Sequence, residues 1–105
     1  MTRGSDDPLG AVVRAAAPAD PDARVCWGLL ERAVEVGWVD ADDLRICVVE
    51  LPRGNDRGYA EFGLQPYGDV LEVSFLDERY RCATRLFVDA MRLVAARLSG
   101  TSATR

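Results

Sequence analysis

Residues 68–98 constrain the fold more than any other part of the chain. Leu71, Val73 and Phe75 alternate with residues that are mostly polar, the period-two pattern of a strand with one buried face. From Asp77 onward the apolar residues recur at helical spacing, which predicts a long helix to the end of this stretch. No other segment offers as much apolar surface. We therefore expect the core to form where this helix packs on the sheet.

Two segments nearer the N-terminus carry helix signals. Asp20 followed by Pro21 is typical of a helix start, and Gly37 supplies the left-handed residue that ends a helix. A main helix is therefore predicted between these signals. A shorter helix is predicted over residues 8–17, although Val12-Val13 would also suit an edge strand.

Two further segments are predicted as strands. Residues 44–51 and 59–64 both alternate between apolar and polar side chains, and the residues between them are rich in Gly and Arg. A four-residue loop at 66–69 would pair Leu64 with Leu71 and keep the apolar side chains on one face. The predicted fold is α+β: a two-layer α-β-β-β-α arrangement with a three-stranded antiparallel sheet, both main helices on one face and an optional short N-terminal helix.

The length of 105 residues allows one domain. We predict a single domain over residues 8–98, between disordered ends at 1–7 and 99–105. No apolar run approaches the roughly 18 residues that a membrane span needs, and the first residues lack the apolar core of a signal peptide. The expected location is cytoplasmic. The 13 basic residues are all arginine, which is typical of a GC-rich bacterial genome.

The chain contains neither histidine nor lysine, and these absences exclude several kinds of chemistry. Without histidine there is no Ser-His or Cys-His nucleophile pair, no imidazole acid or base and no histidine-ligated zinc. Without lysine there is no Schiff base and no phosphate-binding P-loop. We expect a protein that is not an enzyme and that has no cofactor.

Acidic residues and cysteines were considered as metal ligands or nucleophiles. The cluster at residues 40–43 could hold a cation, but it lacks EF-hand spacing, so we favour a solvated turn in which Asp40 caps one helical turn. Cys26, Cys47 and Cys82 are widely spaced and never form a C-x-x-C motif. We expect three reduced thiols, buried as small apolar side chains, and no metal site.

The outer face of the predicted sheet is the candidate functional surface. It would be left uncovered yet carry apolar side chains, a combination that usually marks a partner surface. Glu61 and Glu72 would be diagonal neighbours there, with Arg45 to neutralise them. The residues predicted to line this interface are Arg45, Cys47, Val49, Tyr59, Glu61, Val70 and Glu72.

The leading hypothesis is a small acidic, non-catalytic protein–protein interaction module, of an adaptor, chaperone-like or inhibitor or immunity-like kind. We expect it to form a homodimer through the sheet face, with Tyr59 as the anchor. A membrane is not expected as a partner. The first alternative is a small-ligand binder or minor enzyme that uses Glu61, Glu72 and Arg45.

The second alternative follows from the order of the predicted elements. Helix, three strands and helix is similar to the order in double-stranded-RNA-binding domains, which implies recognition of RNA by shape and phosphate contacts. Those domains begin the last helix with lysines, where this chain has Asp77-Glu78-Arg79-Tyr80-Arg81. The net charge of −4 also opposes binding to phosphates, so nucleic acid is not the expected partner.

Overall fold

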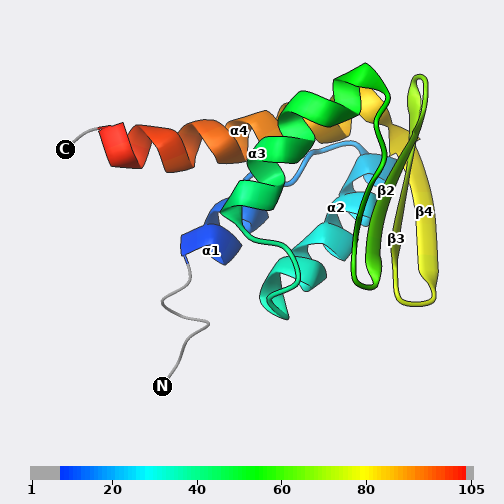
Figure 1. The fold of residues 1–105 in the computed structure, drawn as a ribbon, viewed down its shortest axis with the longest axis horizontal. Coiled ribbons are helices and arrows are strands. Elements are labelled where there is room, and N and C mark those ends of the chain that lie inside the picture. Colours follow the sequence, from blue (N-terminus) through cyan, green and yellow to red (C-terminus); the bar gives the residue numbers. More distant parts are fainter. Residues whose placement is uncertain (1–7, 104–105) are drawn as a thin grey trace.

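The computed structural model describes residues 8–103, and its fold is α+β, as the sequence predicts. The described strands form one antiparallel sheet in the order β1-β2-β3-β4, and the helices lie on one side of it (Figure 1). None of the described helices is long and apolar enough to cross a membrane. In chain order the elements are α1 (Pro8–Ala15), α2 (Pro21–Glu35), α3 (Ala41–Glu50), the 3₁₀ turn η2 (Leu51–Arg53), β1 (Arg57–Tyr59), β2 (Phe62–Tyr67), β3 (Val70–Phe75), β4 (Glu78–Ala83) and α4 (Thr84–Ala103).

The local signals of α2 are confirmed. The Asp20 carboxylate accepts a hydrogen bond from the backbone N–H of Ala23 at 3.0 Å, so Asp20 is the N-cap. Gly37 has a φ of 84°, and the Trp38 N–H donates to the Ala33 carbonyl at 2.9 Å. This is a Schellman ending, which needs a left-handed residue at the glycine position. The short N-terminal helix is also confirmed, as α1. Asp7 before Pro8 is the sequence signal that predicts an N-cap for this helix, and Asp7 lies outside the described residues.

The strand predicted over residues 44–51 is wrong, because this segment forms α3. The Asp40 carboxylate accepts from the Asp43 N–H at 3.0 Å, and the Asp43 carboxylate accepts from the Asp40 N–H at 2.9 Å. Such a capping box starts a helix, which then turns Leu44 and Cys47 into the core. Asp40 is thus a helix cap, as predicted, but the helix continues for ten residues. The apolar residues fit both periods, and the cap together with packing selects the helical one.

The last helix begins later than predicted. Its first turn was expected at Asp77, but residues 78–83 form strand β4, and α4 starts at Thr84. Leu76 and Asp77 are the two turn residues between β3 and β4, and Leu76 has a φ of 55°. The sheet therefore has four strands where three were predicted, and the chain lacks the α-β-β-β-α order of an RNA-binding domain. At its other end α4 runs past residue 98 to Ala103, into the segment predicted to be disordered.

The spacing of three residues predicts that Glu78 pairs with Arg81 and Asp89 with Arg92 along the last helix, and these two predictions have different outcomes. Glu78 and Arg81 cannot pair at helical spacing because both lie on β4. Glu78 instead accepts from Arg32 of α2, with an N–O distance of 2.5 Å. The pair between Asp89 and Arg92 is confirmed, at 3.3 Å.

The predicted register between the second and third strands is wrong by two residues. The turn consists of Gly68 and Asp69, with Gly68 at a φ of 68°, so Leu64 pairs with Val73 instead of Leu71. A shift of two residues leaves every side chain on its predicted face, because side chains alternate with a period of two. The apolar pattern alone could not distinguish the two registers, and the turn decides between them.

The strand predicted over residues 59–64 is divided by a second two-residue turn. Ala60 and Glu61 form this turn, with Ala60 at a φ of 53°, and Tyr59 pairs with Phe62. An alanine in the left-handed region is not a recognisable turn signal, since such turns favour Gly and Asn. The hairpin was therefore not predicted from the sequence.

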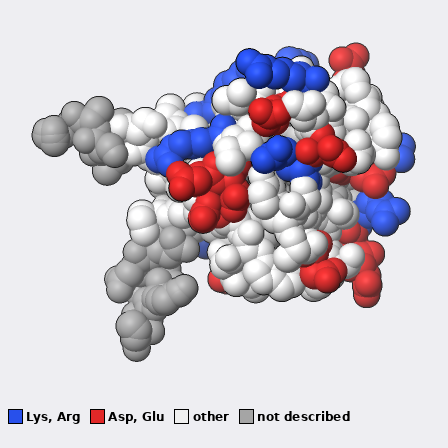
Figure 2. Space-filling view, viewed as in Figure 1, with Lys and Arg blue, Asp and Glu red and all other residues white. Residues whose placement is uncertain are grey.

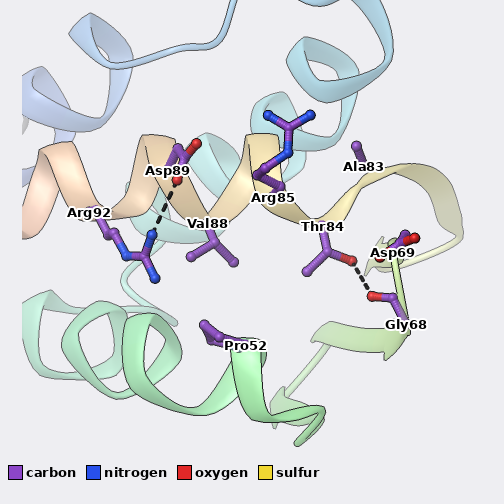
Figure 3. A pocket seen from close by; sticks show the side chains of 9 residues that line it. All are labelled: Pro52, Gly68, Asp69, Ala83, Thr84, Arg85, Val88, Asp89 and Arg92. Atoms are coloured by element: carbon purple, nitrogen blue, oxygen red, sulfur yellow. Dashed lines mark hydrogen bonds and ion pairs between the residues drawn. The ribbon is translucent and has the colours of Figure 1, made fainter.

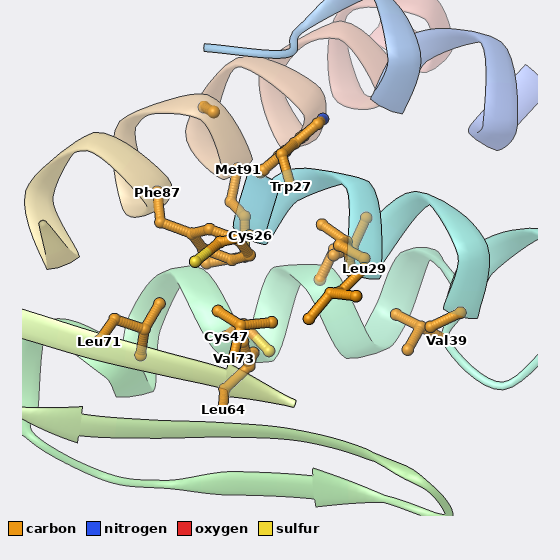
Figure 4. Packing of buried hydrophobic residues seen from close by; sticks show 14 of the residues in the cluster. Cys26, Trp27, Leu29, Val39, Cys47, Leu64, Leu71, Val73, Phe87 and Met91 are labelled. Carbon is orange, nitrogen blue, oxygen red and sulfur yellow. The ribbon is translucent and has the colours of Figure 1, made fainter. Parts of the chain in front are cut away.

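The core lies between the inner face of the sheet and the helices (Figure 4). Trp27 of α2 and Phe87 of α4 are both fully buried and meet edge to face, with ring centroids 5.1 Å apart. The indole Nε1–H of Trp27 donates to the Val13 carbonyl at 2.6 Å, which ties α1 to α2. Leu71 and Val73 of β3 complete the contact with the sheet.

Candidate functional site

The seven residues predicted to form one interface lie on several different surfaces. Arg45 and Val49 are exposed on α3, where Arg45 pairs with Asp42 at 2.8 Å. Cys47 is buried on the opposite side of the same helix, and Tyr59 is half-buried on the inner side of the sheet. The prediction placed Arg45, Cys47 and Val49 on the outer sheet face because it took 44–51 as a strand. Tyr59 was placed there because 59–64 was taken as one strand, without the turn at Ala60 and Glu61.

The other three predicted residues lie closer to their expected places. Val70 and Glu72 do lie on the outer face of the sheet, whereas Glu61 is at the tip of the β1–β2 turn. Glu72 accepts from Arg81 at 3.0 Å and pairs with Arg79 at 3.3 Å, both on the neighbouring strand β4. The proposed cluster of Glu61, Glu72 and Arg45 is therefore not formed.

The outer sheet face is more polar than predicted. Arg81 lies over the ring of Tyr67 at 5.4 Å, and with Arg79 it surrounds the Glu72 carboxylate. The paired glycines Gly58 and Gly63 leave a shallow hollow of about 300 Å³ beside these groups. The face thus offers compensated charge in place of an apolar patch.

Cys47 and Tyr59 form a small polar contact at the edge of the core. The thiol and the phenol hydroxyl share a hydrogen bond at 3.6 Å, and Arg57 Nε–H donates to the same hydroxyl at 3.3 Å. Burial raises the pKa of Cys47 above its usual value. Burial is also the main cause that raises the pKa of Tyr59, to about 12. Both groups are therefore neutral at physiological pH, and neither is an activated nucleophile.

A titration checks this contact. The phenol of Tyr59 should ionise with a midpoint near 12 in the folded protein, against about 10 in the unfolded chain. Because the folded state holds the proton more tightly, the stabilisation from this group is complete below pH 10 and is lost as the pH rises from 10 to 12. Ultraviolet absorption of phenolate, compared between wild type and Tyr59→Phe, measures the midpoint. If the titration step that disappears in Tyr59→Phe has a midpoint near 10, the contact is contradicted.

Another hollow lies beside the start of α4 (Figure 3). It measures about 510 Å³ and is bounded by η2 and the β2–β3 turn. Arg92 pairs with Asp89 at 3.3 Å, and the Thr84 hydroxyl donates to the Gly68 carbonyl at 3.0 Å. Thr84 points toward Pro52, whereas the guanidinium group of Arg85 points away from it. The hollow thus presents no free nucleophile and no acid–base pair.

A different surface, at the end of the molecule where α2 ends and β3 turns into β4, carries several exposed apolar side chains. Its four exposed apolar side chains come from the α2–α3 connection, the β3–β4 turn and β4. Their exposed fractions lie between 38% and 58%. We call this the Trp38 surface, and it comprises Val36, Trp38, Leu76 and Tyr80.

Contacts through Phe75, Arg32 and Glu78 connect three members of the Trp38 surface, Trp38, Leu76 and Tyr80. The Trp38 ring lies 5.6 Å from the ring of Phe75, the residue next to Leu76. The guanidinium group of Arg32 lies over the Phe75 ring, 5.4 Å from its centroid, and pairs with Glu78. The Tyr80 hydroxyl donates to Glu78 at 3.1 Å. In Figure 2, the area over the α2–α3 connection is mostly uncharged, and acidic side chains lie at the lower right, near the β3–β4 turn.

Leu76 is the most unusual member of this surface. It combines the highest exposure of the four, 58%, with a φ of 55°. A leucine in the left-handed region costs about 1–2 kcal/mol relative to an ordinary conformation, and turns normally place Gly, Asn or Asp there. An exposed apolar side chain in a strained backbone position is typical of a functional surface.

The sequence contained only part of the signal for the Trp38 surface. Gly37 predicts the helix end, which brings Trp38 back toward the end of α2. The other half comes from the β3–β4 turn and β4, where the prediction had Leu76 ending a strand and the helix beginning at Asp77. No run of residues reveals the patch, because its parts are brought together by the fold.

Neither a metal site nor a similar protein gives a further indication of function. Within residues 8–103 no group of three or more Cys, Asp or Glu side chains is arranged to hold a metal ion. Comparisons of the chain with protein-family models, with curated proteins and with solved structures found no match. The candidate site therefore rests on the geometry of the Trp38 surface alone.

Proposed function

We propose that this protein is a non-catalytic protein–protein interaction module that binds a second copy of itself through the Trp38 surface. The observation that carries the proposal is the apolar patch itself, which combines Trp, Tyr and Leu with a neighbouring Arg. Trp, Tyr and Arg are the residues that most often dominate the binding energy of protein interfaces. An apolar centre surrounded by a polar rim is also the usual arrangement in protein interfaces.

Charge and area favour a second copy as the occupant. Arg32 and Glu78 carry opposite charges at the edge of the patch. A two-fold contact brings each of them near its opposite on the other chain, so the surface is complementary to itself. The four side chains expose on the order of 350 Å² together, the size of the largest patch on a typical monomer. A standard interface buries about 800 Å² per partner, so the rim must contribute and the dimer should form at micromolar concentration.

The alternatives have less support. A ligand-binding or catalytic cluster of Glu61, Glu72 and Arg45 would need these groups together, and they lie on a turn, on the outer sheet face and on α3. Binding to RNA would need a basic surface, and the arginines of the outer face surround Glu72. We further propose a cytoplasmic location, which the three cysteines, all present as thiols, support.

Sedimentation analysis over a range of concentrations tests the proposal. The wild type should sediment as a dimer above micromolar concentration. Leu76→Asn should shift the equilibrium toward monomer by at least tenfold in the dissociation constant. Asparagine tolerates the left-handed conformation better than leucine, so the variant should keep its fold and melt at the same temperature or higher.

Two matched substitutions show where an interface lies. Val49→Asn changes an exposed aliphatic residue on α3, and Val70→Asn changes one on the outer sheet face. Neither should alter the dimer if the Trp38 surface forms it. A dimer disrupted by Val70→Asn alone would restore the outer sheet face as the interface. A wild type that stays monomeric at high concentration would exclude a second copy as the occupant.

A further inference from the structure

Two of the three cysteines lie against each other inside the fold. Cys82 pairs with Leu71 across β3 and β4, which places its side chain on the inner face of the sheet. Cys26 is buried on α2, the helix that packs against β4, and the Cys82 thiol is its close neighbour. Cys26 is fully buried and Cys82 is 6% exposed. The remaining cysteine, Cys47, shares a hydrogen bond with the Tyr59 hydroxyl.

The interaction between the two thiols makes them unequal. The neighbouring Cys82 thiol lowers the pKa of Cys26 below its usual value. The neighbouring Cys26 thiol, together with burial, raises the pKa of Cys82. Cys26 is therefore the more nucleophilic sulfur of the pair, since the thiolate is the reactive form.

We propose that Cys26 and Cys82 are a latent disulfide site that closes on reaction with a peroxide. The Cys26 sulfur attacks one oxygen of hydrogen peroxide and becomes a sulfenic acid, and water leaves. The Cys82 sulfur then attacks the Cys26 sulfur, so that the S–S bond forms, the S–O bond breaks and a second water leaves. The two thiols lose two electrons in total, and one peroxide is reduced to two waters.

The fold gives this bond a structural consequence. It would join α2 to β4, which is an edge strand of the sheet, and close a loop from residue 26 to residue 82. A cross-link that closes so long a loop restricts the unfolded chain strongly. Because both sulfurs are buried, the peroxide must enter during local opening of the edge strand, so the reaction should be slow.

Peptide mapping tests the proposal directly. Cleavage after arginine places the three cysteines on separate peptides, 25–32, 46–53 and 82–85. The folded protein is treated with hydrogen peroxide, alkylated after denaturation and digested. We expect peptides 25–32 and 82–85 to be joined and to lack two hydrogens, with 46–53 alkylated. The oxidised protein should melt roughly 10–20 °C higher, and dithiothreitol should reverse the shift.

Single substitutions distinguish this pair from random oxidation. Cys47→Ser keeps the pair and should show the same linkage and the same rise in melting temperature. Cys26→Ser and Cys82→Ser should show neither. Linkage through peptide 46–53, or sulfinic and sulfonic acids on unlinked peptides 25–32 and 82–85, would overturn the proposal.

Discussion

Replacing Phe87 by alanine should lower the free energy of unfolding by about 3–5 kcal/mol. Phe87 is fully buried, and its ring meets Trp27 edge to face at the centre of the core. Alanine would leave a cavity that the packed helices cannot fill, and it would also remove the aromatic contact. A domain of this size has a total stability of only about 5–15 kcal/mol, so the variant should be close to unfolding at 37 °C.

Urea denaturation followed by circular dichroism measures the effect of Phe87→Ala. Arg85→Ala is the matched control, because Arg85 lies on the same helix and is exposed, and it should cost less than about 0.5 kcal/mol. Leu86 lies on the apolar side predicted from the sequence but is only half-buried, so Leu86→Ala should cost less than Phe87→Ala. Equal urea midpoints for Phe87→Ala and Arg85→Ala would contradict the orientation of α4, in which Phe87 is buried and Arg85 is exposed.

Replacing Trp27 by phenylalanine should lower the free energy of unfolding by about 1–3 kcal/mol. Phenylalanine keeps most of the apolar contact but loses the indole N–H that donates to the Val13 carbonyl at 2.6 Å. That carbonyl would keep only the hydrogen bond from the Ala16 backbone N–H at 3.2 Å. The lost hydrogen bond costs about 0.5–1.5 kcal/mol, and the smaller ring adds the cost of a small cavity. Since this hydrogen bond ties α1 to α2, the loss should fall mainly on α1.

Two measurements check the Trp27→Phe prediction. The urea midpoint should fall, whereas Tyr67→Phe, at an exposed aromatic residue on the outer sheet face, should leave it nearly unchanged. Trypsin should cut after Arg14 of α1 faster in the Trp27 variant than in the wild type, because α1 would detach more often. An unchanged cleavage rate at Arg14 would mean that the hydrogen bond does not hold α1 in place.

Prediction from the sequence succeeded where the determining chemistry lies within a few residues. The Asp20-Pro21 start and the Gly37 end of α2 depend on hydrogen bonds to adjacent backbone groups, so they can be read locally. The buried face of β3 was also predicted correctly, because alternation within one strand reports one-sided burial. The absence of histidine and lysine removes several catalytic mechanisms whatever the fold.

Only the tertiary structure decided the elements whose local pattern fits two conformations. The apolar residues of 44–51 satisfy both a strand and a helix, and the choice depends on packing of Leu44 and Cys47 against the rest of the core. Residues 78–83 become a strand because β3 offers them a free edge to pair with. The Trp38 surface likewise exists only once α2 and the β3–β4 turn meet. In each case the deciding energy comes from contacts between residues far apart in the chain, which no local window of sequence contains.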